Sequence, residues 1–278
     1  MQNIYLPEVA TIHEIKQETP KIRTLIIDLE KTQPMRILPG QFIELTVFGF
    51  GEFPVSVSGV LNPEGTRIQT TIQQVGKVTE ETAKLSPGSK VGVRGPFGNG
   101  YPLEAMRGKN ICLITGGVGL AAARSLINHI LKNRDLFNKV QLLHGAKTPS
   151  DLIYREFLFN NEEAHKYRID INVTVDRPND RWSWRSGPVT ELFNTAVVHA
   201  DNTIAVICGP GKMIKNVSQH LIEMGFSDDQ VLLALESRMH CGIGMCGHCA
   251  VGYKKVCVDG PIFEYGEVKN NLENLLQV

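Results

Sequence analysis

The sequence predicts a β-barrel plus α/β fold, in which a six-stranded antiparallel barrel is followed by a parallel-sheet domain and a small cysteine-rich segment. Three observations carry this prediction. Short runs rich in Val, Ile, Thr and Phe fill the first hundred residues, strands and helices alternate after residue 102, and four cysteines gather between residues 241 and 257. The expected domains are 1–102, 103–235 and 236–278.

Composition limits the classes of partner. Lys plus Arg and Asp plus Glu each number 29 in 278 residues, so the formal net charge is zero. Nucleic acids and anionic membranes select basic surfaces, so neither is an expected partner. The N-terminal residues lack a basic stretch followed by an apolar one, and no run of about 18 apolar residues occurs. We therefore expect a cytoplasmic protein with no membrane insertion.

The barrel prediction comes from six short segments of high β propensity, separated by turn signals such as Leu38-Pro-Gly40 and Ser86-Pro-Gly88. Strands of this length and spacing are typical of a small antiparallel barrel. One helix, at about residues 77–85, interrupts them. The expected strands cover residues 9–16, 22–29, 41–48, 54–58, 67–75 and 90–94.

After Tyr101-Pro102 the pattern changes to apolar strands that alternate with amphipathic helices. Such alternation predicts a parallel sheet with helices on its faces. The expected strands are 110–115, 140–144, 168–175, 203–208 and 230–235. The expected helices are 120–133, 150–159, a short one at 189–193, and 211–224.

The four clustered cysteines, Cys241, Cys246, Cys249 and Cys257, follow the spacing C-x4-C-x2-C-x7-C. This order is that of the loop that holds a plant-type [2Fe–2S] cluster. The interspersed glycines supply unusual φ angles and backbone N–H groups close to the sulfurs. Structural zinc is an alternative, although it usually uses two C-x2-C pairs. Disulfides are a further alternative, suited to a secreted chain. Because four cysteines fill the site, His248 is expected to face solvent or to support a ligand.

A glycine-rich turn joins the first strand of the α/β unit to its first helix. Gly117-x-Gly119-x-x-Ala122 fits the Rossmann-like dinucleotide fingerprint in its required strand–turn–helix context. The start of the helix offers free N–H groups to a pyrophosphate. A purely structural glycine turn is the alternative. The acidic residue expected after the second strand is missing, because that strand runs into His144-Gly-Ala-Lys147.

A second candidate phosphate site, Gly76-Lys77-Val78-Thr79, opens the lone helix of the barrel half. Gly76 permits close approach, Thr79 offers a hydroxyl at the helix start, and Lys77 adds charge. Taken alone, this sequence is an ordinary helix cap. Together with the downstream glycine turn, it predicts two nucleotides that meet between two domains.

Several motifs then point to a family: Pro54-Val-Ser56, Gly76-x-x-Thr79, Gly95-Pro-Phe-Gly98, Gly116-Gly-Val-Gly119 and Cys208-Gly-Pro210. With them the chain resembles the ferredoxin–NADP reductase-like flavoproteins over nearly its whole length. The cysteine-rich end is similar to electron-transfer subunits that carry an iron–sulfur cluster. These are the gamma (diaphorase) subunit of sulfhydrogenases, the corresponding subunit of anaerobic sulfite reductase and the electron-transfer subunit of dihydroorotate dehydrogenase. Leu235-Glu-Ser-Arg-Met239 most resembles the first two.

The resemblance implies roles for individual residues. The expected catalytic positions are Ser56, near the reactive N5 of the flavin, and Cys208, beside the nicotinamide. Contacts to FAD are implied for Pro54, Val55, Ser56, Gly76, Lys77, Val78 and Thr79. Contacts to NAD(P)H are implied for Gly116, Gly117, Val118, Gly119, Cys208, Gly209 and Pro210.

Two positions bear on the choice of cofactor. Many relatives place Arg where this sequence has Phe53, and that Arg contacts a flavin phosphate; FAD is still the expected flavin rather than FMN. At the end of the third α/β strand the sequence reads Thr174-Val-Asp176-Arg177. A carboxylate accepts hydrogen bonds from ribose hydroxyls and repels a 2′-phosphate, so Asp176 favours NADH, whereas Arg177 favours NADPH.

These features predict an electron-transfer subunit that oxidises NAD(P)H, or reduces NAD(P). It would convert two-electron hydride transfer into one-electron transfer to a partner redox subunit. The expected complex is of the cytosolic hydrogenase or sulfite reductase type. One alternative is the electron-transfer subunit of dihydroorotate dehydrogenase. Another is a non-catalytic sensor module that binds zinc and a nucleotide.

Overall fold

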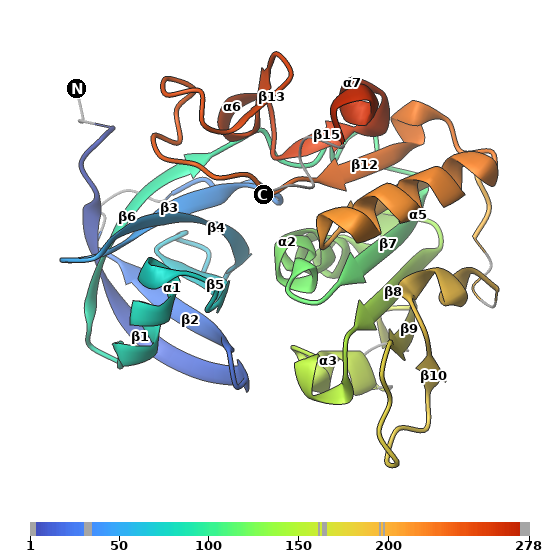
Figure 1. The fold of residues 1–278 in the computed structure, drawn as a ribbon, viewed down its shortest axis with the longest axis horizontal. Helices are drawn as coiled ribbons and strands as arrows, with labels where there is room; N and C mark the ends of the chain where they lie inside the picture. The colour runs from blue at the N-terminus through green and yellow to red at the C-terminus, as the bar shows by residue number, and fades with distance from the viewer. Residues whose placement is uncertain are drawn as a thin grey trace.

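The computed structural model describes residues 4–30, 35–160, 162, 166–194, 196 and 198–272. The first part is a closed six-stranded antiparallel barrel with the strand order β1-β2-β5-β4-β3-β6 (Figure 1). Its core consists of alternate, inward-facing aliphatic side chains such as Leu25, Ile43 and Ile68. All six predicted strands are present, as β1 (Glu8–Thr19), β2 (Ile22–Leu29), β3 (Phe42–Val47), β4 (Gly51–Val60), β5 (Arg67–Gln73) and β6 (Lys90–Phe97).

The second part is a seven-stranded sheet with the order β10-β9-β8-β7-β11-β12-β15. Every pair is parallel except the last, as the strand–helix alternation predicts. The strands are β7 (Asn110–Gly116), β8 (Val140–Ala146), β9 (Ile169–Val175), β10 (Arg185–Ser186), β11 (Thr203–Cys208), β12 (Val231–Ala234) and β15 (Ile262–Glu264).

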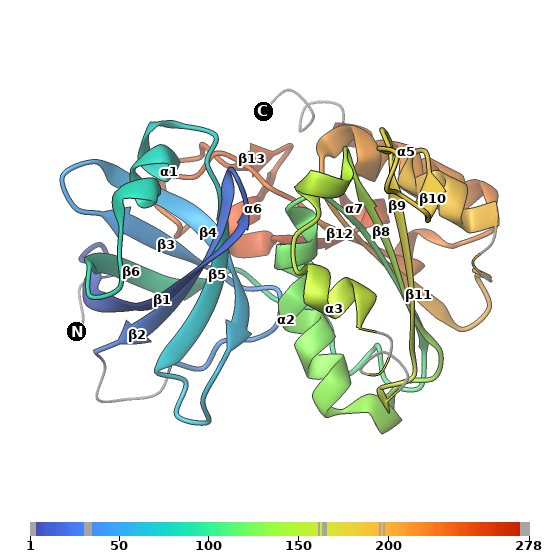
Figure 2. The same cartoon turned by 90° about the horizontal axis from the view of Figure 1, so that it is seen from below.

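Helices cover both faces of this sheet. α2 (Gly119–Lys132) and α3 (Arg155–Phe159) pack on one face, and α5 (Gly211–Glu223) packs on the other with a 3₁₀ turn, Val189–Asn194. Seen from below, α2 lies between the barrel and the sheet (Figure 2). The glycine-rich turn that begins α2 is therefore directed toward the junction of the two parts.

The prediction of one continuous helix over 150–159 is wrong. The segment contains a 3₁₀ turn, Pro149–Asp151, and then α3, separated by extended Leu152 and left-handed Tyr154 (φ 51°). Tyr154 makes tertiary contacts from this conformation. Its backbone N–H donates to Glu18 of β1 at 2.9 Å, and its hydroxyl lies 2.5 Å from the Thr71 hydroxyl of β5. Anchoring to the barrel thus overrides the local helical pattern.

The cysteine-rich segment forms short elements, namely the hairpin β13 (Ala250–Val251) and β14 (Lys254–Lys255), then α6 (Val256–Asp259), β15 and α7 (Tyr265–Val268). β15 pairs antiparallel with β12 and so joins the large sheet. Asn99, just after β6, donates from its side chain to the carbonyls of Asp259 (3.0 Å) and Ile262 (2.7 Å). The segment is therefore attached to both the sheet and the barrel.

Among the described helices, none combines the length and the apolar character that crossing a bilayer requires.

Candidate functional site

A cleft of about 230 Å³ lies where the barrel, the start of α2 and the chain after β12 meet. Pro54, Val55 and Ser56 of β4 line it, together with Thr79 of the α1 turn and Val118 of the glycine-rich turn. Residues from both predicted nucleotide motifs therefore border one space. Phe42 and Phe53 add aromatic surface, and Glu236 and Ser237 add polar groups from the segment that follows β12.

The opening of the barrel at this cleft follows from how β4 is paired. β4 pairs with β3 from Gly51 to Ser56, but it pairs with β5 only from Val57 to Val60. Within the part of the chain that the structure describes, the first half of β4 therefore has one edge that pairs with no strand. Pro54 is tolerated there because a strand with a free edge does not need every N–H for the ladder. This half-paired strand presents its backbone and Ser56 to the cleft.

The predicted flavin-phosphate turn precedes α1 (Lys77–Glu81). The backbone N–H groups of Val75 and Gly76 both donate to the Thr79 hydroxyl at 3.0 Å, and that hydroxyl donates to the Gly76 carbonyl at 2.9 Å. Thr79 thus caps the turn, which is the structural role left open by the sequence. Lys77 is exposed, and the position of a Cβ on Gly76 has no heavy atom within 4 Å. The turn therefore leaves open space beside its backbone.

The glycines after β7 serve two separate purposes. A Cβ on Gly119 would lie 2.3 Å from the Cys208 carbonyl oxygen, and one on Gly116 would lie 2.4 Å from the sulfur of Met213. These two glycines are thus required for α2 to pack against β11 and α5. Gly117 has φ 54° and no heavy atom within 4 Å of its Cβ position, so it faces open space, as a nucleotide cradle requires.

Cys208, at the end of β11, is buried with 1% of its surface exposed. Its sulfur lies 3.3 Å from the hydroxyl of buried Tyr101. Burial raises the pKa of the Cys208 thiol to about 12, so the thiol is neutral at physiological pH. Gly209 and Pro210 follow directly, and Pro210 is the N-cap of α5. An uncharged, polarisable group at this point suits the edge of an aromatic ring.

Asp176 lies just beyond β9, with its side chain exposed. Its backbone N–H donates to Ala146 at 2.9 Å, and that of Arg177 donates to Lys147 at the same distance. The carboxyl ends of β8 and β9 are thus held together there. This is the edge at which α/β sheets bind ligands.

All six cysteines are free thiols, so the four in the C-terminal loop are not joined by disulfides. Cys249 and Cys257 form one close pair, with their sulfurs 3.3 Å apart. Cys246 and Cys241 form the second pair, in which the backbone N–H of Cys246 donates to the sulfur of Cys241 at 3.4 Å. The described residues contain no group of three or more His, Cys, Asp or Glu side chains arranged around a single ion. Two pairs of thiols are the donor set of a two-iron cluster, in which each iron takes two cysteines.

Backbone N–H groups point at the loop sulfurs. Those of Met245 and Cys246 donate to Cys241 Sγ at 3.3 and 3.4 Å, and that of Gly244 donates to Cys257 Sγ at 3.1 Å. Burial opposes ionisation of Cys241, but the N–H donors outweigh it and lower the pKa of this thiol to about 7. Donors already aimed at sulfur fit thiolate ligation, and the glycines provide the φ of +73° to +77° that the loop needs at Gly242, Gly244 and Gly247.

One buried carboxyl group beside this loop was not predicted from the sequence. Glu44 of β3 is buried with 1% exposed, and its Oε1 has no hydrogen-bond partner among the described residues. Burial, with the nearby charge of Glu52, raises the pKa of Glu44 to about 8. The available signal was one acid inside a mostly apolar strand, Phe42–Val47.

A flavin-type barrel joined to a dinucleotide-binding sheet, with a four-cysteine loop, defines the class of ferredoxin reductase-like oxidoreductases. Residues 113–219 match the oxidoreductase NAD-binding domain, and residues 236–269 match the iron–sulfur cluster binding domain of dihydroorotate dehydrogenase B. The chain is 34% identical to sulfhydrogenase 2 subunit gamma of Pyrococcus furiosus, over 95% of this chain and 96% of that protein. It is 32% identical to a probable dihydroorotate dehydrogenase B (NAD(+)) electron transfer subunit of Methanocella arvoryzae, over 93% and 90%.

The chain belongs to this family of electron-transfer subunits. Among solved structures, it superposes on a chain of the NADH-dependent reduced ferredoxin-NADP oxidoreductase with a TM-score of 0.77. That match has 26% identity and covers 100% of this chain and 95% of the other. The two family models thus assign a nicotinamide dinucleotide site and an iron–sulfur cluster to this chain, and the relatives that it matches are named as subunits.

Proposed function

We propose that this chain transfers electrons between NADH and a partner redox subunit, through FAD in the β4 cleft and a [2Fe–2S] cluster on Cys241, Cys246, Cys249 and Cys257. One observation carries the proposal: residues of both nucleotide motifs line a single cleft. The paired cysteines lie on the neighbouring segment between β12 and β15, which contacts the barrel. Two nucleotides held in one cleft allow direct transfer, and a neighbouring cluster provides an exit.

When bound, the flavin accepts a two-electron hydride and the cluster carries single electrons. The protein mainly positions these groups. The free edge of β4 and Pro54-Val-Ser56 would hold the flavin ring, with the Ser56 hydroxyl available to hydrogen-bond near N5. Gly76 to Thr79 would hold its pyrophosphate. Gly116 to Gly119 would hold the pyrophosphate of the dinucleotide, and Cys208, Gly209 and Pro210 would border the nicotinamide.

The proposal is tested on protein purified without oxygen. We expect about one FAD and two irons per chain, a [2Fe–2S] signal by electron paramagnetic resonance (EPR) after reduction, and NADH-dependent dye reduction that exceeds the NADPH-dependent rate. Zinc in place of iron, together with a lack of flavin after reconstitution, would instead establish the non-catalytic sensor module. If the protein contains FMN instead of FAD, only the identity of the flavin changes in the proposal. Phe53 would then be the first residue to mutate, because it replaces the Arg that contacts a flavin phosphate in many relatives.

A hydrogenase-type partner is proposed first, because two sulfhydrogenase gamma subunits of Pyrococcus furiosus are 34% and 36% identical to this chain. The match of residues 236–269 to the dihydroorotate dehydrogenase B domain makes that enzyme the second candidate. Isolation of the native complex from its host distinguishes them. Hydrogen-dependent NAD reduction supports the first candidate, and dihydroorotate-dependent NAD reduction supports the second. We place the complex in the cytoplasm, which fractionation of host cells would check.

A further inference from the structure

Arg94 of β6 connects the barrel to the start of the cysteine loop. Its Nη1 donates to the carbonyl oxygen of Cys241 at 3.1 Å and to that of Ile4 at 3.2 Å. Its Nε donates to Glu52 of β4 at 2.8 Å, and its Nη2 also binds Glu52. Only 5% of the Arg94 side chain is exposed, compared with 24% for Glu52. A fork-shaped guanidinium thus joins two barrel strands and the backbone of a ligand cysteine.

Aromatic packing reinforces this contact. The guanidinium of Arg94 lies 5.5 Å from the centre of the Phe97 ring, which in turn lies 5.8 Å from that of Phe42. A Cβ on Gly242 would be 3.1 Å from the Phe97 ring, so the loop residue after Cys241 rests directly on it. Arg94 and Phe97 therefore form the surface on which the loop begins. Phe42, at the other end of this packing, lines the flavin cleft.

Several ionisable groups lie around the start of the cysteine loop. Glu44 stands opposite Arg94 across β3 and β6. Its side chain lies against the loop, 3.4 Å from the position of a Cβ on Gly242. The Arg94 guanidinium reaches Cys241 itself, and the Glu52 carboxylate pairs with that guanidinium. The Lys255 ammonium binds the loop at another point, the carbonyl oxygen of Gly244, at 2.7 Å. Within the Arg94–Glu52 pair, Arg94 is therefore the nearer to Cys241.

We propose that Arg94 is a positioning residue for the iron–sulfur loop and that the Arg94–Glu52 ion pair sets the reduction potential of the cluster. This inference rests on the proposed function, since it requires a cluster on Cys241. Reduction adds one negative charge to a cluster. A nearby cation therefore stabilises the reduced form and raises the potential, and a nearby anion lowers it. Partial burial keeps solvent from screening this effect fully.

The test is an anaerobic redox titration of the holoprotein monitored by EPR, on Arg94→Gln and Glu52→Gln. We expect opposite shifts. Arg94→Gln should lower the ratio of reduced to oxidised cluster at a fixed potential about tenfold, equivalent to ~59 mV for one electron. Glu52→Gln should raise it by a smaller factor. A merely structural role would loosen the loop in both variants and would not give shifts of opposite sign.

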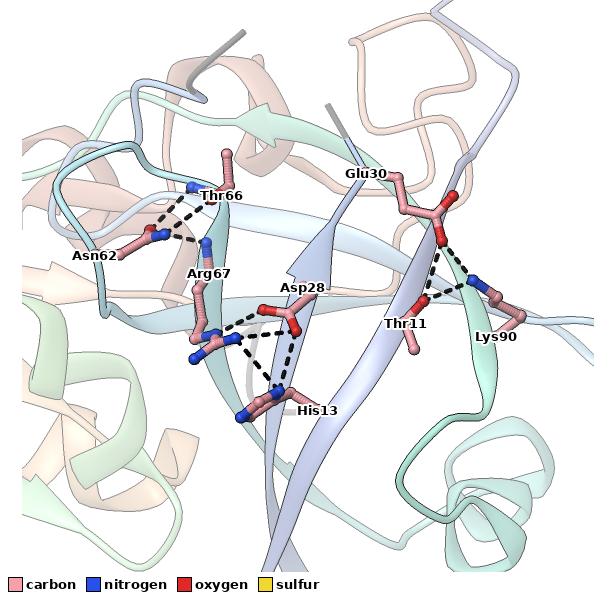
Figure 3. Close-up of polar contacts among 8 residues, drawn as sticks. All are labelled: Thr11, His13, Asp28, Glu30, Asn62, Thr66, Arg67 and Lys90. Carbon is pink, nitrogen blue, oxygen red and sulfur yellow. Dashed lines mark hydrogen bonds and ion pairs between the residues drawn. The ribbon is translucent and has the colours of Figure 1, made fainter. Parts of the chain in front are cut away.

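The matched control is Arg67→Gln, which removes another Arg–carboxylate pair from the same barrel. Arg67 of β5 binds Asp28 of β2 at 2.6 and 3.1 Å, and about 38% of its side chain is exposed (Figure 3). This variant should leave the potential unchanged. If Arg94→Gln fails to assemble a cluster, Arg94→Lys retains the charge and should keep a potential close to that of the wild type.

Shifts of the same sign in Arg94→Gln and Glu52→Gln, or no shift in either with the cluster retained, would overturn the inference. If Arg94→Gln loads no cluster, a Glu52→Gln potential at or below that of the wild type overturns it. Failure of the proposed function has a different signature: the wild-type protein itself would contain no iron and give no EPR signal after reduction.

Discussion

At the scale of a single residue, we propose that Asp176 determines the choice between NADH and NADPH. Its exposed carboxylate lies at the carboxyl end of β9, where a ribose 2′ substituent would approach. We predict that Asp176→Ser raises kcat/KM for NADPH relative to NADH about tenfold, which corresponds to ~1.4 kcal/mol, because a charge repulsion is removed. Steady-state dye reduction with both dinucleotides measures this ratio. Asp180→Ser, on the same exposed loop, is the control, and an unchanged ratio in Asp176→Ser would remove the proposed role.

The buried side chain of His144 makes the free energy of unfolding depend on pH. It is fully buried on β8, where its Nδ1 lies 2.8 Å from the Thr115 hydroxyl and its Nε2 has no hydrogen-bond partner among the described residues. Burial lowers the pKa of His144 to about 4, from 6.5 for an unburied imidazole. Between these values the unfolded chain binds a proton that the folded protein does not. Stability is therefore complete above about pH 6.5 and falls as the pH drops toward 4.

We predict that His144→Gln removes up to about 3 kcal/mol of this acid sensitivity. Urea unfolding of the cofactor-free protein between pH 7 and pH 4.5 measures the difference in slope between the wild type and the variant. His220→Gln on α5, where 43% of the side chain is exposed, is the control variant. Parallel curves for the wild type and His144→Gln would show that this buried imidazole does not limit stability in acid.

At the scale of elements, the turn between β7 and α2 contains one glycine that packing requires, Gly119, and one that faces open space, Gly117. Gly119→Ala would place a methyl group against the Cys208 carbonyl and should cost about 1–3 kcal/mol, because a backbone atom has to move. Gly117→Ala meets no atom but has φ 54°, so it should cost ~1 kcal/mol and mainly raise the KM for NADH. Thermal unfolding and NADH titration of both variants check this. Equal losses of stability and of NADH affinity in the two variants would contradict the distinction.

The regular elements were predictable from the sequence because their signals are local. Six β-rich runs and the strand–helix alternation follow directly from side-chain periodicity, and the cysteine spacing predicted the cluster. The helix at 150–159 was predicted wrongly, since the conformation of Tyr154 depends on contacts with Glu18 and Thr71 far away in the chain. β15 was missed because three residues carry no periodicity. The contacts of Arg94 and Glu44 with the cysteine loop could not be predicted, because these residues lie far from the loop in the sequence and meet it only in the folded chain.

At the scale of the whole molecule, exposed apolar side chains surround the cysteine loop. Met245 lies within it at 74% exposed, Val258 of α6 at 51%, and Leu6 precedes β1 at 65%. Val258 packs against Gly244, and Arg94 binds both Ile4 and Cys241, so these segments are neighbours. Apolar side chains around an electron exit suit a docked redox subunit.

We predict that Met245→Glu weakens co-purification of the partner at least tenfold, because docking would bury the new charge. The EPR spectrum of the cluster and NADH-dependent dye reduction should stay close to those of the wild type. Leu61→Glu, at an exposed apolar position on the β4–β5 connection, should leave the complex intact. Full retention of the partner in Met245→Glu would place the docking surface elsewhere.

Because β15 pairs with β12, the sheet of the nucleotide-binding domain is completed by a strand of the cysteine-rich segment. A chain shortened to end at residue 235 would leave β12 (Val231–Ala234) as an exposed apolar edge strand, whose backbone N–H and C=O groups have lost their partners in β15. Such edge strands pair with strands of other molecules. Light scattering of that fragment should reveal self-association, which the intact chain prevents. The cysteine-rich segment thus also covers the β12 edge of the sheet, a structural role that is separate from binding iron.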